Sequence, residues 1–152
     1  MATSKRNLYP KGQDASFAPH IGFGGNARAA MTFYAQLFGA ADLQITTFAD
    51  APKNQRPPGT DDLVMHAHFT AAPGAVLMGC DIPPGRGTPG MGSTSVFHAA
   101  PDIATARRLF SALADGGSVA MPLAATFWSP AFGMVRDRFG ARWRLSVAAA
   151  AA

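Results

Sequence analysis

Glutamate is absent from this chain of 152 residues, in which all nine acidic side chains are aspartates. Charged residues make up only 14% of the sequence, and Cys80 is its single cysteine. No apolar run approaches the ~20 residues that span a bilayer, and the polar start of the chain has no apolar signal segment. A lone cysteine excludes an internal disulfide and favours a reducing compartment. We therefore expect a cytoplasmic protein that does not insert into membranes.

The positive charge of the chain is concentrated near its start. The formal net charge is +4, and Lys5, Arg6 and Lys11 all lie in the first dozen residues. No run of Lys and Arg interleaves with aromatic residues, so a nucleic-acid partner is not expected. Apolar residues, at 48%, suffice for the core of one ordinary domain. We interpret residues 1–17 as a flexible N-terminal arm and residues 148–152 as an alanine tail.

Between these ends the sequence contains an internal repeat. Asn26 and Asp102 are each suited to cap the start of a helix, and apolar residues follow each cap at one helical face. Gly39 and Gly116 are expected to end the two helices. The apolar residues are Ala30, Phe33, Tyr34 and Leu37 in the first helix and Ala106, Leu109, Phe110 and Leu113 in the second.

One strand-like run precedes each helix and three follow it. The order βαβββ, occurring twice, predicts an α+β fold of two tandem modules, residues 18–82 and 93–147, within one domain spanning 18–147. We expect a curved mixed sheet around a cup, with the helices on its outer face. A Pro- and Gly-rich linker joins the modules. The predicted strands are 19–23, 43–48, 63–70 and 75–80, then 94–99, 119–123, 133–137 and 142–147.

Several motifs resemble those of a known family. GNARAAMTFY at 25–34, LFG at 37–39 and VMHA at 64–67 are similar to the opening motifs of the PhnB-like branch of the vicinal oxygen chelate (glyoxalase/bleomycin resistance/dioxygenase) superfamily. Later motifs match in the same order, over about residues 18–147. Some members carry a demethylubiquinone methyltransferase description. This chain has no glycine-rich nucleotide site after a strand, so we do not expect that activity here.

The resemblance also implies where a metal would bind. Metal-dependent members take His, Gln or Glu ligands from the first and last strand of each module. Counting from helix caps and turns places these positions on Ala18 or Pro19, on Met78, on Ser95 or Val96, and on Arg144. None is a good ligand for a divalent ion, and an arginine repels one. With no glutamate in the chain either, we expect no metal and no other cofactor.

Histidines offer a rearranged site. His66 and His68 are two apart on one predicted strand and so share a face. Three interpretations stay open: hydrogen-bonded strand residues, a zinc or nickel site completed by His20, or acid–base work. His20 is expected to face the cup, because Ile21 and Phe23 suit the helix-covered side. The neighbours of His98 do not determine its orientation.

Three further features have ordinary explanations. The segment 85–90 spells G-x-G-x-x-G, but its prolines forbid the strand–turn–helix that binds a dinucleotide, so we interpret it as linker. Cys80 is expected to be a small buried apolar residue. The loop that contains Phe127 and Trp128 either packs on the core or forms a pocket wall for a flat or apolar ligand.

The last strand says most about a ligand. Trp143, Leu145 and Val147 alternate with Arg142 and its polar neighbours, and the apolar set is expected to take the core. The other set, which includes Arg144 and Ser146, then faces the cup. A buried arginine needs an anionic partner. That partner is either a carboxylate, phosphonate or enolate group of a ligand, or an aspartate, for which Asp42 and Asp81 are the candidates. The alternative is an arginine that needs no such partner because it is solvated at the rim of the cup.

Two functions follow from these observations. The first is a metal-independent small-molecule-binding protein of the PhnB-like glyoxalase/bleomycin-resistance type, with an anionic ligand. The alternative is a lyase-, isomerase- or dioxygenase-related enzyme with a rearranged histidine metal site. We expect a homodimer, because few charges are available to cover exposed sheet edges. The candidate ligand-binding residues are His20, His66, Met78, His98, Trp128, Phe132 and Arg144.

Overall fold

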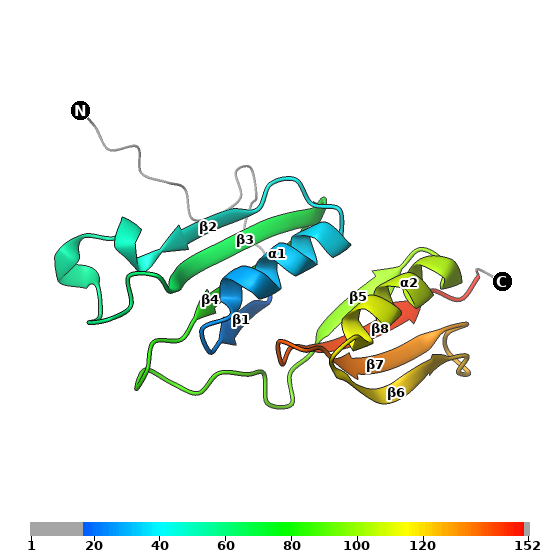
Figure 1. Ribbon diagram of the computed structural model, residues 1–152. Coiled ribbons are helices and arrows are strands. Elements are labelled where there is room, and N and C mark those ends of the chain that lie inside the picture. Colours follow the sequence, from blue (N-terminus) through cyan, green and yellow to red (C-terminus); the bar gives the residue numbers. More distant parts are fainter. Residues whose placement is uncertain (1–16, 151–152) are drawn as a thin grey trace. The chain divides into compact units, whose positions relative to one another are not determined.

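The computed structural model describes residues 17–150 and divides the chain between Pro89 and Gly90 into two compact units. Each unit contains one helix and one four-stranded mixed sheet (Figure 1). The predicted α+β fold of two βαβββ modules is confirmed. The strands form two open sheets, where the sequence predicted one curved sheet. The G-x-G-x-x-G segment lies between the units, outside helices and strands, as the linker interpretation requires.

The first unit has strand order β1-β4-β3-β2. β1 pairs with β4 in parallel, and the remaining pairs are antiparallel. The loop between β2 and β3 contains two 3₁₀ turns, η1 (Phe48–Asp50) and η2 (Lys53–Gln55). The regular elements are β1 (His20–Phe23), α1 (Ala27–Leu37), β2 (Gln44–Thr47), β3 (Val64–Ala72) and β4 (Ala75–Asp81).

The second unit repeats this arrangement with strand order β5-β8-β7-β6, in which β5 and β8 are parallel. The central strand β8 therefore pairs with β5 on one side and β7 on the other. The elements are β5 (Val96–Ala100), α2 (Ile103–Ala114), β6 (Ser118–Ala124), β7 (Phe132–Arg136) and β8 (Arg142–Val147).

Helix α2 forms as the sequence predicts. Asp102 is its N-cap, and the carboxylate accepts a hydrogen bond from the Thr105 amide at 2.7 Å. The glycine after the helix, Gly116, has a φ of +72°, a left-handed conformation that favours glycine and stops a helix. The buried residues of α2 are the four predicted ones, Ala106, Leu109, Phe110 and Leu113.

The start of α1 differs from the prediction. Asn26 occupies the N-cap position, but its side chain makes no capping hydrogen bond. The buried carboxylate of Asp81, at the end of β4, takes this role. Its Oδ1 accepts from the amides of Gly25 and Ala27, both at 2.9 Å, and its Oδ2 accepts from the Val64 amide at 2.9 Å. One residue thus joins the helix start, β3 and β4.

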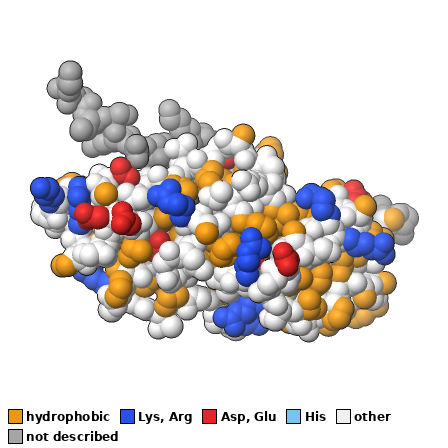
Figure 2. All heavy atoms as spheres, viewed as in Figure 1, with side chains coloured by type: hydrophobic (Ala, Val, Ile, Leu, Met, Phe, Trp, Pro, Cys, Tyr) orange, Lys and Arg blue, Asp and Glu red, His pale blue; other side chains and the backbone are white. Residues whose placement is uncertain are grey.

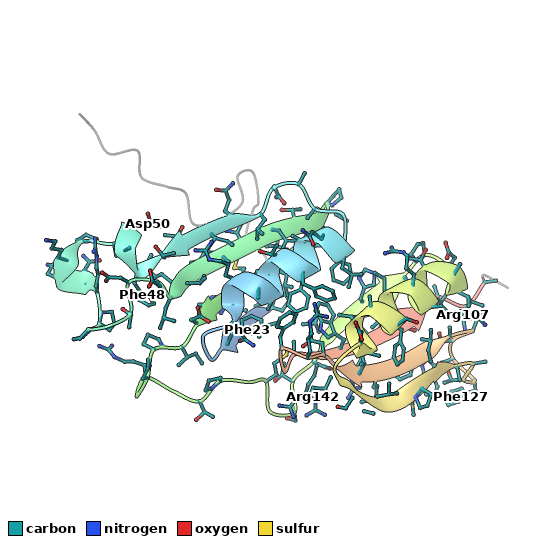
Figure 3. The ribbon with its side chains drawn as sticks, viewed as in Figure 1. Phe23, Phe48, Asp50, Arg107, Phe127 and Arg142 are labelled. Atoms are coloured by element: carbon teal, nitrogen blue, oxygen red, sulfur yellow. The ribbon has the colours of Figure 1, made fainter. Side chains whose placement is uncertain are left out.

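The buried face of α1 is correspondingly shifted from the predicted one. Ala30 and Tyr34 are buried as expected, but Met31 and Ala35 are buried with them. Phe33 and Leu37, expected in the core, are only half-buried. Figure 3 shows Phe23 of β1 beneath this helix. A cap supplied from the sheet sets how the helix lies on it, and helical periodicity alone carries no such information.

Two sequence predictions, the N-terminal arm and the alanine tail, concern the two ends of the chain. Nearly all of the predicted arm, and the last two residues of the alanine tail, lie outside residues 17–150.

Within 17–150, neither helix is long and apolar enough to span a bilayer. In Figure 2 side chains of both charge signs lie over the loop between β2 and β3, so this face carries no field of one sign.

Asp81 provides a stability test. In Asp81→Asn one carboxylate oxygen becomes an amide NH₂, which cannot accept the hydrogen bond that a backbone amide now donates there. The substitution also removes the negative charge. We expect Asp81→Asn to lower the free energy of unfolding by about 2–4 kcal/mol. The matched control is Asp102→Ala at the exposed cap of α2, which should cost roughly 1 kcal/mol. Urea unfolding monitored by circular dichroism measures both. Equal losses for the two variants would contradict the central role of Asp81.

Candidate functional site

Each sheet has one face under its helix and one open face. In the first unit Gly79 faces α1, because a Cβ at this position would lie 3.0 Å from Met31 Sδ and 3.1 Å from a Phe23 ring atom. Its neighbours in β4, Met78 and Cys80, therefore point to the open face.

The register of the first sheet brings the histidines to these two residues. Met78 pairs with His20 of β1 on one side and with His68 of β3 on the other. His66, two residues before His68, lies in the row of Cys80. We call this set the histidine face: His20, His66, His68, Met78 and Cys80. The prediction that His20 lies opposite the helix-covered side is confirmed, because Ile21 and Phe23 are buried and His20 is exposed.

The three imidazoles of the histidine face are close together. Ring centroids are 5.8 Å apart for His20 and His66, and 5.3 Å apart for His66 and His68. His68 is only 4% exposed, and its Nδ1 has no hydrogen-bond partner among the described residues. Burial lowers the pKa of His68, and the carboxylate of Asp42 opposes this without reversing it. A neutral imidazole, able to accept a proton or a cation, is therefore favoured.

The surroundings of Cys80 favour the protonated form of its thiol. Burial raises the pKa of this half-buried thiol, and the neighbouring Asp81 carboxylate raises it further. A protonated thiol is a poor nucleophile. Cys80 thus fits the predicted role of a small apolar residue better than that of a catalytic group.

Divalent metal chemistry would need convergent ligands. Among residues 17–150, no three His, Cys or Asp side chains are placed together so as to hold an ion. The register also shows which residues lie beside the predicted ligand positions Met78 and Arg144. His20, and not Ala18 or Pro19, lies beside Met78. The residue beside Arg144 is Phe97, and not Ser95 or Val96.

The second sheet is orientated by β8. Trp143, Leu145 and Val147 are buried, as predicted from the alternation in this strand. Gly133 of β7 lies on the same side, since a Cβ there would meet the Phe110 ring of α2 at 2.7 Å. Arg142, Arg144 and Ser146 consequently point to the open face.

Arg144 stands in an apolar row on this open face. The register places Phe97 on one side of it and Met134 on the other, and Met121 of β6 pairs with Met134. Within the second unit Phe97 is 60% exposed and Met121 is 41% exposed. We call these four residues the arginine row. A cation flanked by exposed apolar side chains is the geometry that binds a molecule with an acidic group and an apolar body.

Aromatic residues extend the same face. Phe132 of β7 pairs with Ser146, on the side of Arg144, and the Trp128 ring packs edge-on against it at a centroid distance of 5.4 Å. Phe127 in turn lies 4.7 Å from Trp128 and is almost fully exposed. Figure 3 shows Phe127 beyond the strands, in the loop between β6 and β7.

The base of that loop is fixed in place. The Ser129 hydroxyl oxygen lies 2.8 and 2.7 Å from the carbonyl oxygens of Ala131 and Val147, and its one hydrogen can donate to either of them. The amide of Thr126 donates to the Ser129 carbonyl at 2.9 Å. Trp128 is therefore carried by an anchored turn while remaining 48% exposed, which suits a pocket wall as well as simple packing.

Sequence reasoning left His98 undetermined, and the structure places it away from the arginine row. His98 pairs with Leu145, a fully buried residue of the helix-covered face, so its side chain lies on that side of β5. Burial lowers the pKa of His98. Phe97, which the sequence analysis did not select, takes the open position instead. The sequence held no signal that separated Phe97 from Val96, because both residues are apolar.

The aspartates considered as partners for Arg144 are engaged elsewhere. Asp81 binds three backbone amides, and Asp42 accepts a hydrogen bond from the Thr70 amide at 2.9 Å. Within the described residues no carboxylate forms an ion pair with Arg144; the salt bridge found there joins Arg56 to Asp61 at 3.9 Å. Within its own unit the guanidinium is therefore available to an anion.

Comparisons with known proteins agree on one family. The family model described as 3-demethylubiquinone-9 3-methyltransferase matches residues 15–146. Protein YjdN of Escherichia coli strain K12 is 30% identical over 139 residues, covering 86% of this chain and 93% of YjdN.

Solved structures share the fold. PA1353 from Pseudomonas aeruginosa is 37% identical with a TM-score of 0.81, over 89% of this chain and 98% of the other. The PhnB protein from Bacillus cereus is 26% identical with a TM-score of 0.71, over 88% and 100%. A glyoxalase-related enzyme from Fulvimarina pelagi, at 21% identity over 89% and 88%, shares the fold alone, with a TM-score of 0.54.

The environment of His98 predicts a pH dependence. Its pKa in the folded protein lies below the ordinary value of 6.5, so the unfolded chain takes up the proton first as the pH falls. Stability should therefore decrease between pH 7.5 and 5.5. In His98→Gln this decrease should be smaller, which urea unfolding at the two pH values measures. A decrease as large as that of the wild type would show that His98 does not contribute.

Proposed function

Because the chain belongs to the PhnB-like family of the vicinal oxygen chelate superfamily, we propose that it is a metal-independent small-molecule-binding protein. The ligand is an anion with a flat apolar body. The observation that carries the proposal is the arginine row, in which a guanidinium without a carboxylate partner in its unit stands between Phe97 and Met134. The bleomycin-resistance type of protein binds without chemical change, which is the role proposed here.

The arginine row supplies both parts of such recognition. A guanidinium donates two parallel hydrogen bonds to a carboxylate or phosphonate, and these charge-assisted bonds are the stronger kind. Phe97 and Met121 offer apolar surface on either side, and Trp128 offers a ring face or edge to a planar group. Phe132, buried beneath Trp128, supports the aromatic part of the site.

Metal independence is proposed from the donor set. The predicted ligand positions Met78 and Arg144 lie beside His20 and Phe97, respectively. These four residues include one imidazole and one thioether, no carboxylate, and a fixed positive charge. Divalent ions of the hard or borderline kind prefer carboxylate and imidazole ligands, so these positions do not suit one.

The second candidate is an enzyme related to lyases, isomerases or dioxygenases. The observation in its favour is the clustering of His20, His66 and His68, which could exchange protons with a substrate or share an ion. The enzyme candidate requires the histidine face, whereas the binding proposal requires the arginine row. A variant that affects one sheet therefore separates the two.

Substitution of Arg144 tests the binding proposal. Cinnamate is a suitable flat anion, and cinnamamide is its uncharged counterpart. We expect cinnamate to raise the melting temperature of the wild type and to bind roughly 10- to 100-fold more weakly to Arg144→Met, because one charge-assisted contact is lost. Arg107→Met, on the exposed surface of α2 (Figure 3), is the matched control and should bind as the wild type does.

Two outcomes would reject this assignment. Equal affinity of wild type and Arg144→Met for the anion would show that the arginine is not the anchor. Loss of binding after dialysis against EDTA, restored by Zn²⁺ or Ni²⁺, would favour the histidine enzyme. The same titrations with cinnamamide, which should bind no better to the wild type than to Arg144→Met, show whether the charge is recognised.

We further propose that the protein is a cytoplasmic homodimer. In the second sheet β6 is an edge strand whose Val119 and Met121 are exposed, and Figure 2 shows hydrophobic side chains gathered over this part of the unit. Exposed apolar edges favour pairing with a second copy. Multi-angle light scattering at micromolar concentration should give twice the 15.8 kDa chain mass. A monomer mass under these conditions would contradict the proposal.

A further inference from the structure

The histidine face has a donor composition that the binding function does not use. Along one row of the first sheet the residues are His20, Met78 and His68, one from each of three neighbouring strands. Continued by one residue beyond the Ala67–Gly79 pair, the same antiparallel register places His66 opposite Cys80. Neighbouring strands are about 4.8 Å apart, so side chains of one row that share a face can reach a common ligand. Three imidazoles, a thioether and a thiol are thus presented together.

His68 shows that the face lacks a partner for one of its groups. The side chain is 4% exposed, and its Nδ1 is buried without a hydrogen bond among the described residues. A buried polar atom without a partner is destabilising, so a ligand that bound Nδ1 would remove that cost. Met78 lies beside His68 in the same row, and the His66 ring contacts the His68 ring. Both neighbours carry lone pairs that can bind a metal ion.

The kind of ligand follows from the donors. No carboxylate belongs to the histidine face, and Asp42, the acidic residue whose charge reaches His68, is at an exposed position and accepts from the Thr70 amide. Hard cations such as Mg²⁺ and Ca²⁺ require oxygen ligands and are not suited. Thioether and thiol sulfurs, with imidazole nitrogen, select soft ions, and monovalent copper is the biological ion that takes a low number of such ligands.

We propose that the histidine face binds one monovalent copper ion through His66, His68 and the thioether of Met78. Met78 is central because no three His, Cys or Asp side chains of the described residues converge on an ion by themselves. A thioether completes the set without adding charge. This inference is independent of the proposed binding function, which uses the other sheet.

Met78→Leu is the sharpest variant. The two side chains have similar volumes, so the fold is preserved while the sulfur is removed. Met134→Leu is the methionine control, since Met134 lies on β7, a central strand of the second sheet, beside Arg144. His98→Gln serves as the histidine control, because His98 lies on a helix-covered face.

The experiment is an anaerobic titration of Cu⁺ into the full chain, in competition with the chromogenic chelator bicinchoninate. We expect one equivalent to be withdrawn from the chelator by the wild type and by both controls. Met78→Leu and His68→Asn should each bind at least tenfold more weakly. Arg144→Met should bind Cu⁺ as the wild type does, so that failure of the anion site and failure of the copper site are told apart.

The interpretation does not depend on the buried histidine alone. If His68→Asn unfolds, as its circular dichroism spectrum would show, Met78→Leu decides the matter. Absence of competition by the wild type would overturn the proposal. So would Met78→Leu binding with unchanged affinity, and so would an equal loss in Met134→Leu. Zn²⁺ added in place of Cu⁺ should compete weakly, and preference for Zn²⁺ would also contradict a soft site.

Discussion

The buried carboxylate of Asp81 is the interaction on which the first unit depends. It carries a negative charge in the interior and receives hydrogen bonds from three backbone amides, those of Gly25, Ala27 and Val64. Two of these amides belong to the start of α1, where the aligned peptide dipoles favour a negative charge. The charge is thereby compensated without a cationic side chain. Because Asp81 is the last residue of β4, it attaches α1 to the strand that lies between β1, which carries His20, and β3, which carries His66 and His68.

This attachment determines which face of the sheet is left open. Once α1 covers the side of Gly79, strand periodicity directs Met78 and its row to the opposite side. The second unit reaches the same arrangement by another route. There Asp137 accepts from the amides of Phe139 and Ala141 and from the indole nitrogen of Trp143 at 2.9 Å. That bond ties the turn before β8 to a core residue and so fixes the strand that carries Arg144.

The two open faces therefore differ in chemistry although their architecture is the same. One carries imidazoles and sulfurs, and the other carries a guanidinium among apolar side chains. A repeat of βαβββ duplicates the scaffold, while the residues at alternate strand positions are free to diverge because they do not contribute to the helix-covered core. The positions paired in register, His20 with Met78 and Phe97 with Arg144, show how far that divergence has gone.

The sequence was sufficient for features set by local patterns. Both helices, the Asp102 cap and the alternation in β8 depend on residues close together in the chain, and they were predicted correctly. The wrong cap at Asn26 and the shifted face of α1 have one cause, since Asp81 lies more than fifty residues from the helix it caps. His98 could not be orientated because Val96 and Phe97 are both apolar. Only pairing with Leu145 assigns His98 to the covered side.

The residues that lie beside Met78 and Arg144 could not be predicted from the sequence for a related reason. Counting along the chain locates residues within a strand, whereas a site needs the register between strands, which long-range pairing decides. The register pairs Met78 with His20 and Arg144 with Phe97. An imidazole can bind a metal ion, whereas a phenyl ring and a guanidinium cannot. A guanidinium supplies a positive charge to an anion but cannot lower the pKa of a bound water as a metal ion does. Arg144 beside Phe97 is therefore suited to hold an anionic group.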